Sequence, residues 1–329
     1  MSVPITLACE RYDRTEALRD GRVVPAGVDL TYLPQQVEET FFRMARFREF
    51  DAAEMSLSSY VLGLTREDPP FVAIPVFPSR FFRHSGIYVR ADSPVTEPKQ
   101  LAGGTVGIAE WQLTANVWIR GILADEYDLP VDAVSYRTGG LLDPGRPEKL
   151  KVELPSQIRL SPIDADQTLS AMLAEGEIDA IYSPRAPRGF GGPDAPIRRL
   201  FADSRAAEAE YFRRTRIFPT MHVVVLRRDV YERNRWLARS LYDAFAEAKR
   251  LAEENFEETA ALRVMLPWFL DEADATRELM GPDFWAYGLE PNRHVLDTFL
   301  GYALDQGIAA RPVTAEELFA PETLESTLV

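Results

Sequence analysis

Two of the chain's three histidines are His84 and His222. They fall in residues 80–85 and 218–222, the two short segments predicted to cross between two lobes of the chain. Histidine is the side chain best able to exchange a proton near neutral pH. A lone histidine is more often a buried structural residue, but two in such segments favour a shared role in proton transfer. The third, His294, lies on a predicted C-terminal helix, and we expect it to be structural.

Arginines surround one of these histidines, in the segment FPSRFFRHS at residues 77–85. A guanidinium group suits a planar carboxylate because it donates two parallel hydrogen bonds. Residues three apart in an extended segment point to opposite faces, so we expect only one of Arg80 and Arg83 to face a ligand. Arg185, which follows another predicted strand, is a third candidate, and a surface position is the alternative for each. These residues predict a site for a small anion.

Further polar side chains lie where predicted strands end. Glu10 and Glu54 can orient an imidazole, accept a hydrogen bond from a hydroxyl group, or simply cap a helix. Thr114 opens a predicted helix whose free amide groups can receive a carboxylate, although an ordinary N-cap is the alternative. Two histidines and these carboxylates can also bind a metal, but no HxH or HExxH spacing supports a metal site, and none is expected.

Composition narrows the function classes. A net charge of −14 argues against nucleic acid as a partner, because phosphate binding needs a basic surface. Cys9 is the only cysteine, so no intrachain disulfide or cysteine-based metal cluster forms. No apolar segment has the length of a membrane span and no leader is evident, so we expect a cytoplasmic protein with no membrane partner. The GxGxxG, P-loop and GxSxG motifs are absent, and we expect no cofactor.

The elements that must position these residues alternate between strands and helices, a pattern typical of a parallel α/β sheet. The expected strands are 3–9, 28–33, 51–55, 71–76, 86–90, 104–109, 178–182 and 221–226. The expected helices are 15–20, 38–48, 56–64, 114–124, 166–175 and 293–306, with a largely helical stretch after the last strand. Residues 139–155 are rich in Gly, Pro and charge and are predicted to form a long surface excursion.

At 329 residues the chain exceeds what one hydrophobic core usually supports. We therefore expect an α/β protein of two lobes, with residues 1–88 and 217–329 in lobe 1 and residues 89–216 inserted as lobe 2. Ligands of open α/β sheets bind at the carboxyl ends of strands, at topological switch points. The sequence thus predicts a ligand cleft at the hinge, where His84, His222 and an arginine meet.

Five segments resemble the 4,5-dihydroxyphthalate decarboxylase family. They are FFRHSGIYV at 81–89, TANVWIRGIL at 114–123, GEIDA at 176–180, FPTMH at 218–222, and GPDFW followed by YG at 281–288. The FRHS and FPxMH segments are the more specific, whereas many binding-protein folds share GEIDA. The resemblance covers most of the chain and implies a cytoplasmic enzyme with a two-lobed, type II periplasmic-binding-protein-like fold.

The resemblance also implies a chemistry. Removing an aryl carboxylate needs a proton at the ring carbon that bears it, and a para hydroxyl group supplies the electrons without a cofactor. His84 or His222 is then the proton donor, the other histidine polarises or deprotonates the hydroxyl, and Arg83, Arg80 or Arg185 holds the remaining carboxylate. The other residues expected to bind substrate are Glu10, Glu54, Ser85, Thr114 and Trp118, the last as a ring-stacking or a core residue.

Two other functions remain open at this point. A solute-binding protein for a small anionic, aromatic ligand has the same fold, and fold does not decide function. A related cytoplasmic enzyme of thiamine-precursor or menaquinone biosynthesis is the second, although those families do not combine the FRHS and FPxMH segments. The expected partner is a small aromatic carboxylate, and a homo-oligomer is left open.

Overall fold

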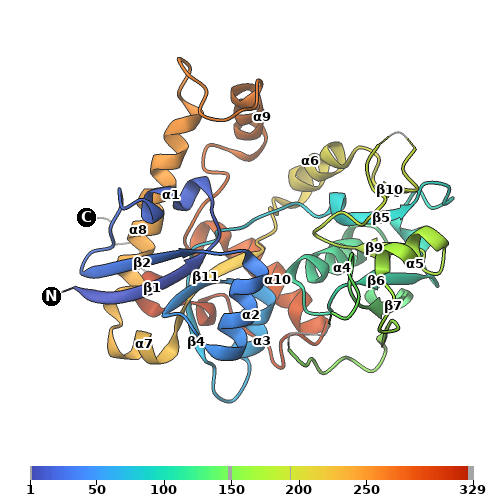
Figure 1. Cartoon of the computed structure of the whole chain (residues 1–329), viewed down its shortest axis with the longest axis horizontal. Coiled ribbons are helices and arrows are strands. Elements are labelled where there is room, and N and C mark those ends of the chain that lie inside the picture. The colour runs from blue at the N-terminus through green and yellow to red at the C-terminus, as the bar shows by residue number, and fades with distance from the viewer. Residues whose placement is uncertain (1, 147–149, 193, 325–329) are drawn as a thin grey trace. The chain divides into compact units, whose positions relative to one another are not determined.

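The computed structural model describes residues 2–146, 150–192 and 194–324, which divide between two compact units (Figure 1). Unit 1 comprises Met1–Arg80, Thr220–Asp297 and Val313–Val329, and unit 2 comprises Phe81–Pro219 and Thr298–Pro312. Residues 81–88 and 217–219, which we had expected in lobe 1, lie in unit 2, as does 298–312. The FRHS segment therefore packs with unit 2 and not with the strands that precede it.

The sheet of unit 1 has the strand order β2-β1-β3-β11-β4. Its strands are β1 (Val3–Cys9), β2 (Val28–Pro34), β3 (Ala52–Ser56), β4 (Phe71–Ile74) and β11 (His222–Arg227). The predicted parallel arrangement holds for β1, β2 and β3, but β11 runs antiparallel to both of its neighbours. The first residue of β11, His222, therefore lies at the same end of the sheet as the last residues of β1 and β3.

Helices flank this sheet and complete the core of unit 1. They are α1 (Asp13–Arg19), α2 (Val37–Phe47), α3 (Leu57–Leu64), α7 (Arg228–Arg233), α8 (Trp236–Glu253) and α9 (Phe269–Met280), with the start of α10 (Arg293–Asp305). The apolar residues of α8, such as Leu237, Leu241 and Phe245, recur at helical spacing and are fully buried. Helix α1 packs on α8, which fixes the residues that follow β1.

Unit 2 contains a six-stranded mixed sheet of order β10-β5-β9-β6-β7-β8. Its strands are β5 (Ile87–Arg90), β6 (Thr105–Ile108), β7 (Ser135–Thr138), β8 (Arg159–Pro162), β9 (Ala180–Tyr182) and β10 (Ile197–Arg199), and its helices include α4 (Thr114–Glu126), α5 (Leu169–Glu175) and α6 (Ser204–Thr215). Strands β6 to β9 are parallel, whereas β5 is antiparallel to β9 and β10. The short, polar strands β7, β8 and β10 were not predicted.

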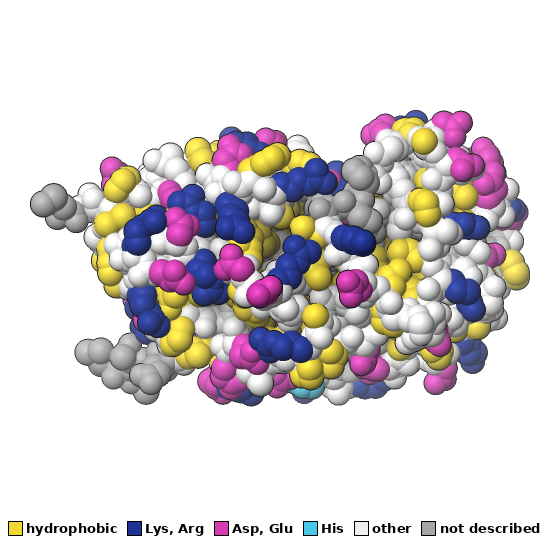
Figure 2. Space-filling view, turned by 90° about the horizontal axis from the view of Figure 1, so that it is seen from below, with side chains coloured by type: hydrophobic (Ala, Val, Ile, Leu, Met, Phe, Trp, Pro, Cys, Tyr) yellow, Lys and Arg dark blue, Asp and Glu magenta, His cyan; other side chains and the backbone are white. Residues whose placement is uncertain are grey.

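Charged side chains of both signs share the surface. On the face seen in Figure 2, Lys and Arg side chains lie among Asp and Glu and form no continuous basic stripe. Among the residues described, every helix falls short of the length and apolar character needed to cross a membrane.

Candidate active site

The centre of the candidate site in unit 1 is a hydrogen-bonded pair, Glu54 and His222. Glu54 is the third residue of β3 and His222 the first of β11, which pairs with Ser56, so the two side chains are diagonal neighbours on one face of the sheet. His222 Nδ1 lies 2.6 Å from Glu54 Oε1. A carboxylate only accepts, so Nδ1 carries the proton of this contact, and Nε2 remains for a ligand.

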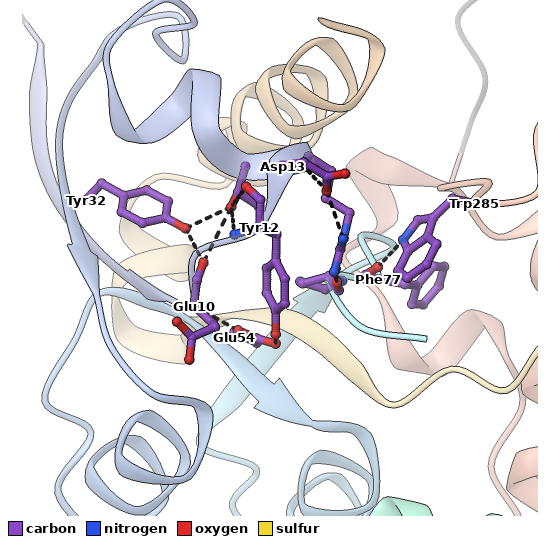
Figure 3. A network of polar contacts seen from close by, with 10 residues as sticks. Glu10, Tyr12, Asp13, Tyr32, Glu54, Phe77 and Trp285 are labelled. Atoms are coloured by element: carbon purple, nitrogen blue, oxygen red, sulfur yellow. Dashed lines mark hydrogen bonds and ion pairs between the residues drawn. The ribbon is translucent and has the colours of Figure 1, made fainter. Parts of the chain in front are cut away.

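The Glu54 carboxylate is fully buried and receives further donors from the residues after β1. The Glu10 N–H donates to Oε2 over 3.1 Å, and the Tyr12 hydroxyl donates to Oε1 over 2.8 Å. Burial by itself raises the pKa of Glu54, but His222, the Glu10 amide and Tyr12 hold it below its ordinary value. Figure 3 shows the Tyr12 ring reaching from the start of α1 to this carboxylate. The site thus contains an ionised carboxylate, Glu54, which is held in one orientation and is hydrogen-bonded to His222.

A stacked arginine continues the network from Tyr12. The guanidinium carbon of Arg14 lies 4.1 Å from the centroid of the Tyr12 ring and 4.3 Å from that of Trp285. Arg14 Nε donates to the Pro78 carbonyl over 2.7 Å, and Trp285 Nε1 donates to the Phe77 carbonyl over 2.9 Å (Figure 3). These bonds fix both partners of the stack.

Sequence reasoning selected Glu54 and His222 but missed Tyr12, Arg14 and Trp285. Glu54 takes the first of the three roles considered for it, that of orienting an imidazole. Tyr12 and Arg14 follow the same strand end that drew attention to Glu10, so that rule could have included them. Nothing in the sequence links them to Trp285, more than 250 residues later.

His84 is buried among aromatic side chains of unit 2. Its side chain is 1% exposed, and its ring packs against Tyr127, Phe201 and Tyr211 of its own unit at centroid distances of 5.7, 5.1 and 5.2 Å. Burial and the charge of Arg214 lower the pKa of His84 to about 4. The ring is therefore a neutral part of the packing of unit 2, and its expected role as a proton donor stays a prediction. Because His84 and His222 belong to different units, their meeting at the hinge stays a prediction.

The neighbours of His84 are packed into the same turn. Arg83 is 8% exposed, lies 4.9 Å from the Phe81 ring centroid, and has its pKa lowered by burial to about 10, so it stays charged near neutral pH. The Ser85 N–H donates to Glu208 Oε1 over 3.0 Å. A Cβ on Gly86 would lie 2.8 Å from the Ser183 carbonyl oxygen, so only glycine fits. Roles of Arg83 and Ser85 toward substrate remain predictions.

Arg80 and Trp118 both make contacts within the fold, and their expected roles toward a ligand stay predictions. Arg80 Nη2 donates to the Ala286 carbonyl oxygen over 2.9 Å and to Asn292 Oδ1, so this arm of the fork ties the C-terminal turn to the chain. Trp118 is fully buried, and its ring lies 5.4 Å from that of Phe299. Its place is in the core, the alternative given above to ring stacking.

The remaining candidates stay predictions. Arg185 is exposed just after β9, where its own N–H donates to Ser183 Oγ over 3.1 Å. Thr114 is the first residue of α4 and is buried, and Glu10 is half-buried after β1. Within residues 2–146, 150–192 and 194–324, no three His, Cys, Asp or Glu side chains are grouped as a metal site requires.

Comparison with known proteins places the sequence in a family. No protein-family model matches the sequence. A 4,5-dihydroxyphthalate decarboxylase of Comamonas testosteroni is 41% identical over 322 residues, which cover 98% of both chains. A second, from Pseudomonas putida, is 39% identical over 209 residues, covering 64% of this chain and 81% of the relative.

Among solved structures, the Candida albicans CA3427 gene product, which exhibits the generic periplasmic binding protein fold, superposes with a TM-score of 0.54 at 12% identity. The match covers 98% of this chain and 96% of that protein, and it shows the fold alone. The two compact α/β units thus form a periplasmic-binding-protein-like fold, as the sequence predicted. Since the first relative matches nearly end to end, the chain belongs to the 4,5-dihydroxyphthalate decarboxylase family.

Proposed function

We propose that the protein is a carboxy-lyase that removes one carboxylate from a hydroxylated aromatic dicarboxylate such as 4,5-dihydroxyphthalate. Two decarboxylase relatives at 41% and 39% identity support the reaction class. The observation that carries the mechanism is the Glu54–His222 pair. The buried carboxylate orients the imidazole through Nδ1, and we assign Nε2 to the substrate. The proposal keeps the expectation of a cytoplasmic enzyme, which fractionation of cells producing the chain tests.

The first step is proton transfer to carbon. His222 in its protonated form donates the Nε2 proton to the ring carbon that bears the carboxylate, and the hydroxyl group para to that carbon supplies electron density to the ring. Glu54 stabilises the imidazolium before the transfer and keeps its ring oriented during it.

Carbon–carbon cleavage follows. The bond between the ring and the carboxylate breaks, its electron pair restores the aromatic ring, and carbon dioxide leaves. One proton is consumed in each turnover, and His222 regains it from solvent through its partly exposed edge, which has 16% of its side-chain surface accessible. No oxidant, reductant or electron sink enters this balance.

The carboxylate that stays on the ring needs a cation to hold it. The departing carboxylate should lack such a cation, because tight pairing stabilises the ground state and slows the loss of carbon dioxide. Arg83 and Arg185 are the arginines that the proposal keeps for this task. Arg185 is exposed after a strand end, and a guanidinium fork matches a carboxylate. Arg80 is dropped because its Nη2 bonds go to the protein itself.

The test compares the parent chain with His222→Gln and Glu54→Gln, with His294→Asn as a matched control that changes an exposed histidine on α10. Release of carbon dioxide from 4,5-dihydroxyphthalate is measured, and circular dichroism checks that each variant folds. We expect His222→Gln to lose activity by about a hundredfold to ten-thousandfold and the control to match the parent. A folded His222→Gln variant as fast as the parent overturns the mechanism. If the parent chain binds the compound and releases it unchanged, the proposed enzyme activity is wrong and the protein is a binding protein.

A further inference from the structure

Unit 1 contains a pocket of about 130 Å³ next to the Arg14–Trp285 stack. Its walls include Arg14, Lys249, Ala252, Phe256, Phe284 and Trp285, contributed by α1, the end of α8 and the residues before and after α9. Glu54, Tyr12 and His222 do not line it. The pocket is therefore distinct from the candidate active site but shares Arg14 with its network.

The size and lining of the pocket suit one aromatic ring. A cavity of about 150 Å³ lined by apolar side chains binds benzene, and this pocket is close to that volume. The rings of Phe256 and Phe284 lie 5.9 Å apart at an angle of 50°, and the Trp285 indole is held by its bond to Phe77. Such walls offer an incoming ring both face and edge contacts.

The charges at the rim favour an acceptor group on that ring. Lys249 is only 13% exposed in its side chain, and its ammonium group contacts Glu253 over 2.7 Å and Asp283 over 2.8 Å. An ammonium group has three N–H donors, so one remains after these two acceptors. Asp13, the other carboxylate at the pocket, is bonded by Arg14 over 3.0 Å. The nearby carboxylates are thus already engaged, which disfavours a cationic ligand and leaves a donor for an oxygen.

We infer that this pocket is a second ligand site, for a single-ring aromatic acid, and that its occupant acts on the Glu54–His222 pair through Arg14 and Tyr12. A ring seated against Trp285 contacts one side of the stack that holds Arg14, and Tyr12 on the other side donates to Glu54. The effect on catalysis rests on the proposed function, since removing one carboxylate from an aromatic dicarboxylate leaves an aromatic monocarboxylate. The product then belongs to the chemical class that this site recognises.

The binding test uses benzoate, which has one carboxylate and no hydroxyl group to support decarboxylation. Its binding is followed by the indole N–H resonance of Trp285, assigned with a Trp285→Phe variant. Ala252→Leu fills the pocket, and Ala246→Leu, six residues earlier on the same helix, is the matched control. We expect benzoate to shift the resonance in the parent and in Ala246→Leu, with binding at least tenfold weaker in Ala252→Leu. If Ala252→Leu does not fold, Phe284→Leu, which removes a ring from the wall, replaces it with the same expectation.

Two comparison ligands and one further variant separate the outcomes. Cyclohexanecarboxylate lacks the aromatic ring and benzamidine reverses the charge, so both should bind at least tenfold more weakly than benzoate. Equal binding of benzoate to the parent and the filled variant, or preference for benzamidine, overturns the site. The shift should persist in His222→Gln, which distinguishes this pocket from the active site and does not depend on decarboxylation. For the coupling, benzoate should lower kcat in the parent and not in Ala252→Leu, whereas purely competitive inhibition in both overturns it.

Discussion

Tyr12 and His222 bind the same oxygen of one buried carboxylate. The Tyr12 hydroxyl donates to Glu54 Oε1 over 2.8 Å, and His222 Nδ1 lies 2.6 Å from that atom. The second oxygen accepts from the Glu10 amide and contacts the Cys9 thiol. A carboxylate shared in this way is held in one orientation, and each donor affects how strongly it binds the other.

Replacing Tyr12 with Phe tests that relationship. The substitution keeps the ring against which Arg14 stacks and removes the hydroxyl donor, so the pKa of Glu54 rises from its lowered value. We expect the acid limb of the pH–rate profile to move to higher pH and kcat to fall about tenfold, with KM unchanged. Tyr32→Phe is the control, because its hydroxyl donates to the Glu10 carbonyl and Thr15 and not to Glu54. Identical profiles for parent and Tyr12→Phe contradict the role.

Glu54 also predicts a pH dependence of stability. Its pKa in the folded chain lies below the ordinary 4.5, so the ionised carboxylate stabilises the fold fully above about pH 4.5. This contribution is lost as the pH falls through the folded-state pKa. We expect Glu54→Gln to be less stable than the parent at pH 7 by about 1 to 3 kcal/mol, with the gap closing in acid. Urea unfolding at pH 7, 5 and 3.5 measures it, and a gap that is constant with pH contradicts the assignment.

His84 predicts that stability changes in a second pH range, separate from that of Glu54. Its folded-state pKa of about 4 lies below the ordinary 6.5, so the unfolded chain binds the proton first as the pH falls. The parent chain should lose about 3 kcal/mol of unfolding free energy from this group between pH 6.5 and 4. His84→Phe, which keeps an aromatic ring among Tyr127, Phe201 and Tyr211, should lack this loss, and His294→Asn should retain it. Equal slopes for all three chains contradict the buried, neutral imidazole.

Two glycines with opposite surroundings give a stability prediction. Gly86→Ala places a methyl group 2.8 Å from the Ser183 backbone carbonyl, and we expect a loss of about 1 to 3 kcal/mol. Gly301→Ala lies on the exposed side of α10 with nothing within 4 Å, so it should gain about 0.5 to 1 kcal/mol. Thermal unfolding of both variants checks the pair, and a neutral Gly86→Ala contradicts the tight turn.

The sequence predicted the elements that carry strong local patterns. The apolar run of β1 and the helical spacing of α8 need little help from the rest of the chain. Strand β1 has the predicted bounds, and α8 lies in the stretch that was expected to be largely helical. Strands β7, β8 and β10 are only three or four residues long and carry exposed polar side chains, so their pairing depends on neighbours. Local pattern cannot supply that information.

In the candidate site, too, local sequence pattern pointed to some features and could not supply others. Glu54 was selected because it lies near the predicted end of a strand, and His222 because it is a histidine in a short segment between predicted elements. The direction of β11, which places the two side chains on one face, is a property of the sheet and not of either strand. The burial of His84 could not be predicted, because its aromatic neighbours lie about 40 to 130 residues away in the sequence and a motif does not report them.

Cys9 is the last residue of β1, fully buried, with Sγ 3.5 Å from Glu54 Oε2. Burial and the neighbouring carboxylate raise the pKa of the Cys9 thiol well above its ordinary value, so the folded chain presents no thiolate to an alkylating reagent. As the chain's single cysteine, it is a natural reporter: the rate of its alkylation measures how often the centre of unit 1 opens. Substrate analogues that seat against His222 should slow this labelling, which gives a read-out of occupancy that needs no turnover.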